Sequence, residues 1–236
     1  MTVSPYWMFV AAGALACAGL CIAARRRPGP WVTWAGRAIA VVLATDAVFE
    51  LAKPIARGDW SVKTSLPLAL CSVAGIVAIG ACWFRDWQLG AELTYFWGLT
   101  GTLQAVATPD LYAEFPQLEF FLFVIGHIGI VFAAVFLVVG QHRTPRPNAA
   151  PRVFVISLGY TVFVGAFDWL TGSNYMFLRA LPGKSSLLSV LGPWPWYIVS
   201  AAGVAAVMLL LLDMPFRLAR RGRIGPPAPF GLRAAG

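Results

Sequence analysis

Ser65-Leu66-Pro67-Leu68-Ala69-Leu70-Cys71-Ser72 opens an apolar run that continues to about residue 84. A run of about 18 residues is close to the roughly 20 apolar residues with which an α-helix crosses the hydrocarbon core of a bilayer. The run places a cysteine about one helical turn inside the expected membrane boundary. It therefore predicts a membrane-spanning helix with Cys71 near one end.

The composition of the whole chain is typical of a membrane protein. Of its 236 residues, 59% are hydrophobic and 12% are charged, and the mean hydropathy is +0.72. The charged share is roughly half that of a soluble domain. The apolar runs are continuous and do not alternate with a period of two, which favours helices over a barrel. We therefore predict an all-α polytopic protein that is multi-pass in the cell membrane.

Seven hydrophobic segments are expected, at approximately residues 5–24, 34–52, 66–84, 90–108, 118–140, 152–171 and 194–213. Most of the 18 Lys and Arg residues fall on the inner side if the N-terminus lies outside, which predicts an N-out/C-in orientation. Residues 1–216 are expected to form a single transmembrane helical domain, in which a proline-containing linker at 141–151 separates five helices from two. Residues 217–236 are expected to form a disordered basic cytoplasmic tail that attracts anionic lipid headgroups, at about 1 kcal/mol per charge.

Several classes of function find no support in the sequence. The net charge of +8 does not indicate a nucleic-acid partner, because the basic residues lie in short loops and in the tail. The four cysteines all lie in apolar segments, so no disulfide framework is expected. No Walker sequence, Rossmann glycine pattern or zinc-ligand spacing occurs, so neither a cofactor nor a metal is expected. The sequence leaves the oligomeric state open.

Most of the residues that are unusual in a membrane helix fall in the outer half of the predicted bundle. At 1.5 Å per residue, Cys71 is expected roughly 8 Å and His127 roughly 14 Å below the outer boundary. A nucleophilic cysteine needs a base within hydrogen-bond reach, and His127 is the one histidine in a predicted helix. The candidates for binding substrate, stabilising an oxyanion or orienting the pair are Glu50, Gln104, Asn174, Tyr175 and Trp196.

Cys71 and His127 each have a structural interpretation as well. Burial in hydrocarbon opposes formation of the thiolate, and Cys71 can instead pack as a small apolar residue. His127 can be a neutral imidazole that is hydrogen-bonded to Gln104 or Glu50.

The other candidates also have structural interpretations. Glu50 can pair with a nearby lysine or arginine at the interface, whereas Asp46, one turn earlier, lies deeper and is harder to explain as a surface residue. Trp196 belongs to an aromatic run typical of a membrane interface, and Asn174 and Tyr175 can cap a helix.

Six segments, in order between about residues 40 and 215, resemble the YwaF-like bacterial integral membrane proteins. They are LPLALCS at 66–72, YFWGLTGTLQA at 95–105, TPD at 108–110, GH at 126–127, NYMFL at 174–178 and GPWPWY at 192–197. This family resembles a eukaryotic transmembrane acyltransferase family that remodels ether phospholipids, in which a cysteine and a histidine are taken as catalytic. It is more distantly similar to the androgen-induced membrane hydrolases, which use threonine and histidine. The resemblance implies that Cys71 and His127 are a catalytic pair, without identifying the substrate.

These observations lead to one main hypothesis and two alternatives. The main hypothesis is a membrane-embedded lipid acyltransferase or acyl hydrolase whose Cys71–His127 pair opens to the outer leaflet, with membrane lipids as acyl donor and acceptor. One alternative is a permease or channel-like protein in which Asp46, Glu50 and His127 line a polar path to the inner face. The other is a structural membrane protein in which the polar residues hold the helices together.

Overall fold

The computed structural model describes residues 4–109, 113–181 and 187–222. Within these ranges the chain is helical and has no β-strand. The elements are α1 (Pro5–Arg26), α2 (Trp31–Arg57), α3 (Leu70–Trp83), α4 (Gln88–Trp97), the π-helix η1 (Gly98–Thr102), α5 (Leu103–Ala107), α6 (Leu118–Val135), the π-helix η2 (Phe136–Gly140), α7 (Ala149–Thr171), the 3₁₀ turns η3 (Tyr175–Phe177) and η4 (Leu187–Val190), and α8 (Trp196–Arg221). Because η1 joins α4 to α5 and η2 extends α6, the described ranges contain seven helical segments besides the 3₁₀ turns. The predicted all-α fold and number of helices are confirmed.

Four of the segments are long and apolar enough to cross a membrane: Pro5–Arg26, Leu118–Gly140, Ala149–Thr171 and Trp196–Arg221. Helix α3 is apolar but has only 14 residues. It begins at Leu70, so the expected start at residue 66 was wrong. Pro67 disfavours helical conformation in Leu66, the residue before it, and the chain is still extended at Ala69, with φ −63° and ψ 144°.

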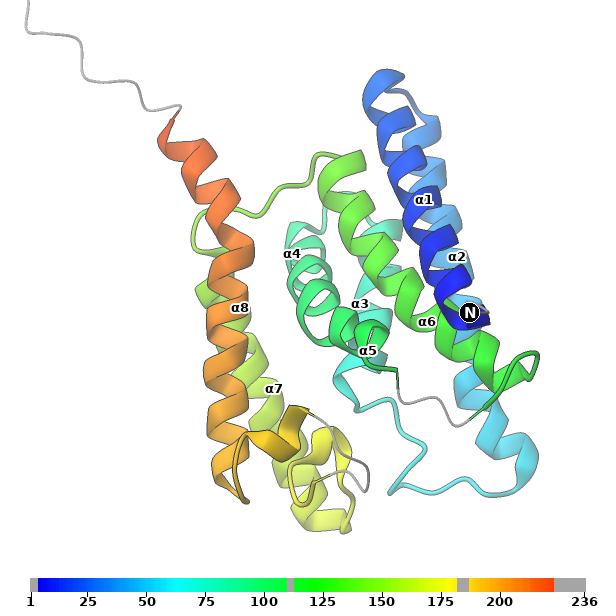
Figure 1. Ribbon diagram of the computed structural model, residues 1–236, viewed down its shortest axis with the longest axis vertical. Helices are drawn as coiled ribbons and strands as arrows, with labels where there is room; N and C mark the ends of the chain where they lie inside the picture. The colour runs from blue at the N-terminus through cyan, green and yellow to red at the C-terminus, as the bar shows by residue number, and fades with distance from the viewer. Residues whose placement is uncertain (1–3, 110–112, 182–186, 223–236) are drawn as a thin grey trace, which may run out of the picture.

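Successive segments run in opposite directions, so the bundle has two ends (Figure 1). Helices α1 to α6 form a body centred on α3, which packs against α2, α4 and α6. Helices α7 and α8 pack on each other as a hairpin and reach the body mainly through α4 and η1. The linker between η2 and α7 therefore separates five segments from two, as expected.

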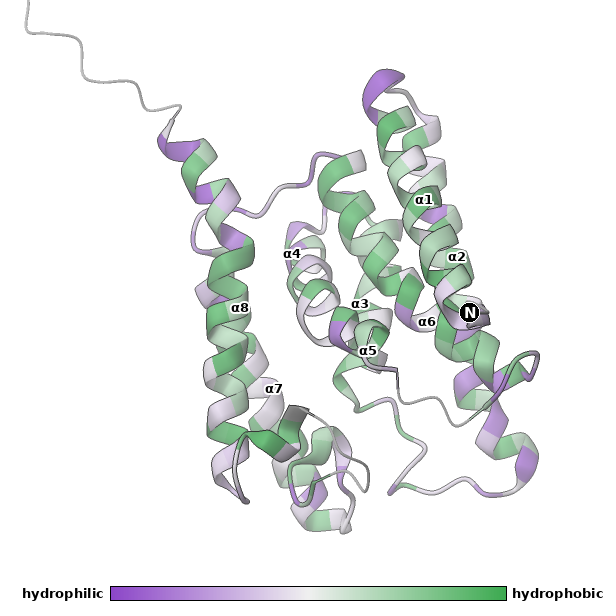
Figure 2. Ribbon diagram, in the orientation of Figure 1, coloured by the Kyte–Doolittle hydropathy of each residue, from purple (hydrophilic) through white to green (hydrophobic). Residues whose placement is uncertain are grey.

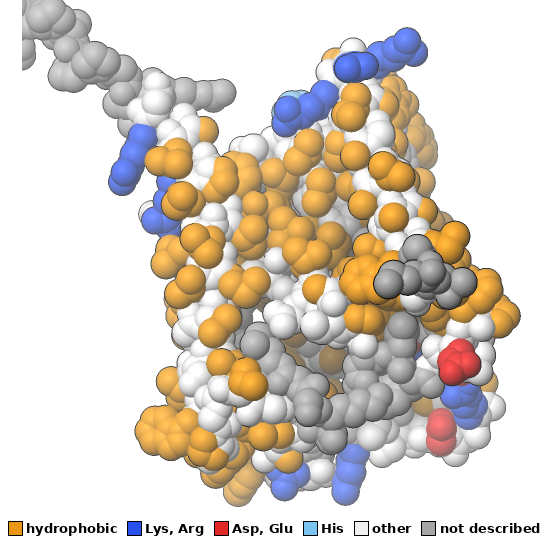
Figure 3. All heavy atoms as spheres, in the orientation of Figure 1, with side chains coloured by type: hydrophobic (Ala, Val, Ile, Leu, Met, Phe, Trp, Pro, Cys, Tyr) orange, Lys and Arg blue, Asp and Glu red, His pale blue; other side chains and the backbone are white. Residues whose placement is uncertain are grey.

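Small side chains on α3 form the centre of the body. Ala74, Ala78 and Ala81 are fully buried, and they belong to one core cluster with Phe96 of α4 and Leu137 of η2. Small residues let helices approach closely, which matters in a bilayer because lipid tails are as apolar as the side chains that they would replace. The outward faces of the helices are apolar along most of their length (Figures 2 and 3).

Arginines gather at one end of the bundle, which we call the arginine end (Figure 3). It comprises the C-terminal ends of α1 and α8 and the loops that precede α2, α4 and α7. The ends of α2 and α7 and the starts of α3, α6 and α8 lie at the opposite end. This segregation is the pattern from which the N-out/C-in orientation was predicted, and the orientation itself stays a prediction.

A buried carboxylate attaches the linker to the body. The Glu92 side chain is 0% exposed. Its Oε1 accepts hydrogen bonds from the backbone N–H (3.0 Å) and Nε (2.8 Å) of Arg146, and its Oε2 accepts from Arg152 (2.8 Å). The hydrogen bond that Arg146 donates to Glu92 raises the pKa of Arg146 above its usual range. The linker is thus fixed to α4 by charge-assisted bonds rather than by apolar contact.

Helix α8 continues to Arg221, so residues 217–221 of the predicted tail are helical. Residues 223–236 lie outside the described residues, as do Asp110 of the 108–110 segment and Lys184 of the loop before α8.

Candidate active site

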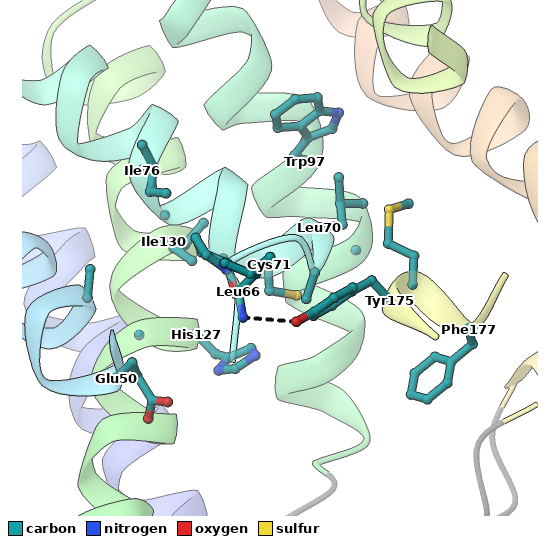
Figure 4. Close-up of a pocket in the computed structure, with 18 of the residues that line it drawn as sticks. Glu50, Leu66, Leu70, Cys71, Ile76, Trp97, His127, Ile130, Tyr175 and Phe177 are labelled. Carbon is teal, nitrogen blue, oxygen red and sulfur yellow. Dashed lines mark hydrogen bonds between the residues drawn. The ribbon is translucent and has the colours of Figure 1, made fainter. Parts of the chain in front are cut away.

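A cavity of about 1180 Å³ lies between the body and the α7–α8 hairpin. Its walls come from α2, α3, η1, α6, α7, η3 and α8, and Figure 4 shows part of the lining. One part of the wall is apolar, with Leu70, Trp97 and Phe154. Another part, at the end of the bundle opposite to the arginine end, carries charged residues including Glu50 and Lys53. The cavity is therefore amphipathic.

The cavity brings together five of the seven residues singled out from the sequence: Glu50, Cys71, His127, Asn174 and Tyr175. Gln104 lies half-buried on α5 and does not line it. Trp196 is 65% exposed at the start of α8, and its neighbour Tyr197 lines the cavity instead.

Cys71 is the second residue of α3, at its N-terminus. It is only half-buried and faces the cavity, whereas Cys17, Cys21 and Cys82 are buried. Among the described residues, the backbone N–H groups of residues 70–72 have no acceptor, since the first bond of the helix runs from Val73 N–H to the Ala69 carbonyl. Free N–H groups at a helix N-terminus stabilise negative charge nearby. Cys71 is therefore a half-buried cysteine at a helix N-terminus that lines the cavity.

A hydroxyl from η1 also reaches Cys71. Thr102, which is 1% exposed, donates a hydrogen bond to the Cys71 Sγ over 4.0 Å. Two glycines, Gly98 and Gly101, allow η1 to pack closely against neighbouring residues. A Cβ on Gly98 would lie 3.0 Å from the Ala134 Cβ, and one on Gly101 would lie 3.3 Å from a methyl group of Leu70. Single π-turns within helices often occur at functional sites, and this one brings a hydroxyl to the sulfur.

His127 reaches the cavity from α6 and has a defined tautomer. Its Nδ1 lies 2.9 Å from the Phe123 carbonyl oxygen, which can only accept, so Nδ1 carries a proton. In the neutral ring Nε2 is then unprotonated, and it has no hydrogen-bond partner among the described residues. The ring stacks on Phe123 with 4.2 Å between centroids, which fixes its plane. Figure 4 shows the Cys71 sulfur and the imidazole with the Leu66–Tyr175 hydrogen bond drawn between them, and no hydrogen bond joins the two side chains in the described part of the chain. His127 therefore presents a basic nitrogen to the cavity.

Two acidic residues on α2 lie beside His127. Asp46 lines the cavity and is 9% exposed, and its Oδ1 has no hydrogen-bond partner in the described part of the chain. A Cβ on Gly126 would lie 2.7 Å from the Asp46 Oδ2, so the glycine leaves room for the Asp46 carboxylate next to His127. Glu50 forms an ion pair with Lys53 at 3.1 Å, which is the structural role that the sequence left open for it.

Tyr175 and Asn174 organise loops around the cavity. The Tyr175 hydroxyl donates to the Val62 carbonyl and accepts from the Leu66 N–H, both at 2.9 Å (dashed line in Figure 4 for the latter). The hydroxyl proton of Tyr175 is thus already used in a hydrogen bond, and the side chain positions the loop before Cys71. The Asn174 amide is bonded to the backbone of residues 179 and 180 in a similar way.

Sequence reasoning missed three contributors to the site. Thr102 stood in the quoted segment at 95–105 without a role. Tyr160 donates from α7 to the Leu68 carbonyl at 2.9 Å, which holds the same loop as Tyr175 does. Ser72 lines the cavity next to Cys71. A hydroxyl within an apolar helix was the available signal in each case. Within the described ranges no three His, Cys, Asp or Glu side chains gather to hold a metal ion.

Comparison with known proteins gives two matches. A sequence profile described as the TMEM164 family matches residues 1–213. An uncharacterised protein of Treponema pallidum (strain Nichols) is 28% identical over 169 residues, which cover 68% of this chain. The matched region spans 66% of the length of that relative. No solved structure matches the chain significantly.

Proposed function

The chain belongs to the TMEM164 family, and from the cavity described above we propose that it is a membrane-embedded lipid acyltransferase or acyl hydrolase. Within the family we assign it to the YwaF-like bacterial group. The observation that supports the activity best is the shared cavity of Cys71 and His127, in which the accessible cysteine lies at a helix N-terminus and the histidine offers Nε2.

The proposed reaction has two halves. In the first, Nε2 of His127 takes the Cys71 thiol proton and the sulfur attacks the carbonyl carbon of a lipid ester. The ester C–O bond breaks, the leaving alcohol takes the proton from His127, and the acyl group remains on Cys71 as a thioester. In the second, His127 takes the proton of an acceptor alcohol or of water, whose oxygen attacks the thioester. The C–S bond breaks and the proton returns to Cys71.

The negative charge that develops on the carbonyl oxygen needs hydrogen-bond donors. Tyr175 and Asn174 are bonded to backbone groups, so we assign this role to the free N–H groups of residues 70–72. Thr102 positions the sulfur and favours its thiolate through its hydrogen bond.

The substrate enters, in this proposal, from the outer leaflet of the cell membrane. The arginine end is the cytoplasmic side of a multi-pass protein with N-out/C-in orientation, because basic loops stay inside. The cavity reaches the opposite end, where Lys53, Arg57 and Glu119 line it.

A permease needs a polar path through the whole bundle. None of the described residues that line the cavity belongs to the loops at the arginine end. Within the body, fully buried Ala81, Phe96 and Leu137 pack together in one core cluster toward that end. The absence of lining residues from those loops favours an enzyme over a channel.

The test is labelling of the purified protein with a lipid-like, cysteine-directed acyl probe. We expect labelling at Cys71 that Cys71→Ala abolishes and that His127→Ala slows about 10²-fold or more, the usual contribution of a general base. Cys82→Ala is the matched control, since it removes a buried cysteine of the same helix. Thermal unfolding checks that each variant is folded. Labelling that persists in Cys71→Ala, or a rate independent of His127, would contradict the proposal.

A further inference from the structure

A second hollow, of about 230 Å³, lies at the arginine end and takes no part in the proposed chemistry. It is lined by Arg217, Arg220 and Arg221 from the last turns of α8 and by Pro147 and Asn148 from the linker. We call it the arginine hollow. We propose that it binds the phosphate group of an anionic phospholipid.

Two of its guanidinium groups are held in place from behind. Asp213, which is fully buried, accepts from the Arg217 Nε at 2.5 Å and lies 3.5 Å from Arg220. Arg220 also donates to the Pro145 carbonyl at 3.0 Å, which connects α8 to the linker. These bonds use only part of each guanidinium, which has five N–H donors, so the others remain for a ligand. The two side chains are thus pre-organised, which reduces the ordering cost of binding.

The third guanidinium is uncommitted. Arg221 is exposed and has no hydrogen-bond or ion-pair partner among the described residues. Three arginines with one carboxylate, Asp213, leave the hollow with an excess of positive charge. Planar guanidinium groups match the oxygens of a phosphate, and the pairing is stronger than a neutral hydrogen bond.

The location favours a lipid as the source of the phosphate. Helix α8 has 26 residues. At 1.5 Å per residue it is about 39 Å long, which exceeds the hydrocarbon core of about 30 Å. Its last turns therefore reach the headgroup layer, where basic pockets between membrane helices bind anionic headgroups. The excess positive charge favours a lipid with a net negative headgroup over a zwitterionic one.

The test uses the full chain in nanodiscs of phosphatidylcholine with a minor fraction of phosphatidylglycerol. Lipids that remain bound after release from the disc are counted by native mass spectrometry. We expect phosphatidylglycerol to be enriched, and Arg221→Gln to weaken its binding about fivefold, as for loss of one charge near the surface. Arg221 is exposed and forms no hydrogen bond or ion pair with a described residue, so the substitution is not expected to unfold the chain. Arg27→Gln is the matched control, an exposed arginine just after α1 at the same end.

Each outcome decides the proposal. Enrichment that falls in Arg221→Gln and persists in Arg27→Gln supports a defined site. An equal fall in both variants would show diffuse attraction to the arginine end, and absence of enrichment would show no lipid site. A third outcome would reassign the hollow to a free phosphate ion. In that case phosphatidylglycerol is not enriched, whereas inorganic phosphate stabilises the protein in pure phosphatidylcholine and no longer does so in Arg221→Gln. The test does not depend on the proposed acyl chemistry.

Discussion

Glu92→Gln is expected to weaken the attachment of the α7–α8 hairpin to the body. The substitution keeps the size of the side chain and removes the charge that binds Arg146 and Arg152. Removing one partner of a fully buried ion pair costs about 3–5 kcal/mol. Here only the carboxylate is fully buried, since the two arginine side chains are 47% and 36% exposed. After the substitution they can turn to water, which places the expected loss of stability lower, at about 2–3 kcal/mol.

Thermal unfolding in mild detergent measures this loss. For a chain of this size, 1 kcal/mol corresponds to roughly 2–4 °C in Tm, so a decrease of roughly 4–12 °C is expected. Protease cleavage within the linker should rise in parallel, because the Arg146 N–H loses its charged acceptor. Glu50→Gln is the control, since its pair with Lys53 is exposed and worth about 0–1 kcal/mol. If Glu92→Gln lowers the Tm no more than Glu50→Gln does, the buried carboxylate does not hold the linker.

Two further substitutions test the surroundings of the candidate pair. Gly126→Ala should lower stability by about 1–3 kcal/mol in thermal unfolding, because the new methyl group would lie 2.7 Å from the Asp46 Oδ2. Gly159→Ala is the control on α7, where the new methyl group would meet open space, and it should not lower stability. Equal losses of stability in the two variants would argue against a close contact between Gly126 and Asp46. Thr102→Val should slow acyl-probe labelling of Cys71 while leaving the Tm nearly unchanged, because valine keeps the shape and removes the hydroxyl that donates to the sulfur. Thr100→Val is the control, since the Thr100 hydroxyl donates to the Phe96 carbonyl, and it should leave labelling of Cys71 unchanged. If Thr100→Val slows labelling as much as Thr102→Val does, Thr102 has no specific role.

The fold was predictable because hydropathy and the distribution of arginine are properties of the sequence alone. Each of the seven helical segments in the described ranges overlaps a hydrophobic segment expected from the sequence, although the fourth is rich in polar residues. The start of α3 was missed because the apolar run begins before the helix does. The prediction did not take into account that Pro67 disfavours helical conformation in Leu66. The two π-helices were not foreseen, since an extra residue in a turn depends on packing with neighbouring helices, as at Gly98 against Ala134.

The candidate site was predictable in part. Counting residues from the expected membrane boundary placed Cys71 and His127 near the same end, and both line one cavity. The orientation of their side chains depends on contacts between helices that lie far apart in the sequence. Thr102 approaches Cys71 from 31 positions away, and the Tyr175 hydroxyl binds Leu66 from 109 positions away. No local pattern encodes such distances, so these roles could come only from the structure.

The short length of α3 explains why a cavity forms beside Cys71. With 14 residues, the helix is about 21 Å long, against a hydrocarbon core of about 30 Å. If α3 crosses the bilayer, as the sequence predicts, the chain covers the remaining depth as irregular loop, and backbone polar groups at that depth need partners or a water-filled space. The α7–α8 side supplies partners, since Tyr175 binds Val62 and Leu66 while Tyr160 binds Leu68. The N–H groups of residues 70–72 receive none among the described residues, and all three residues line the cavity. A longer α3 would satisfy those groups within the helix, so the start of the helix at Leu70 is what leaves them without partners next to Cys71.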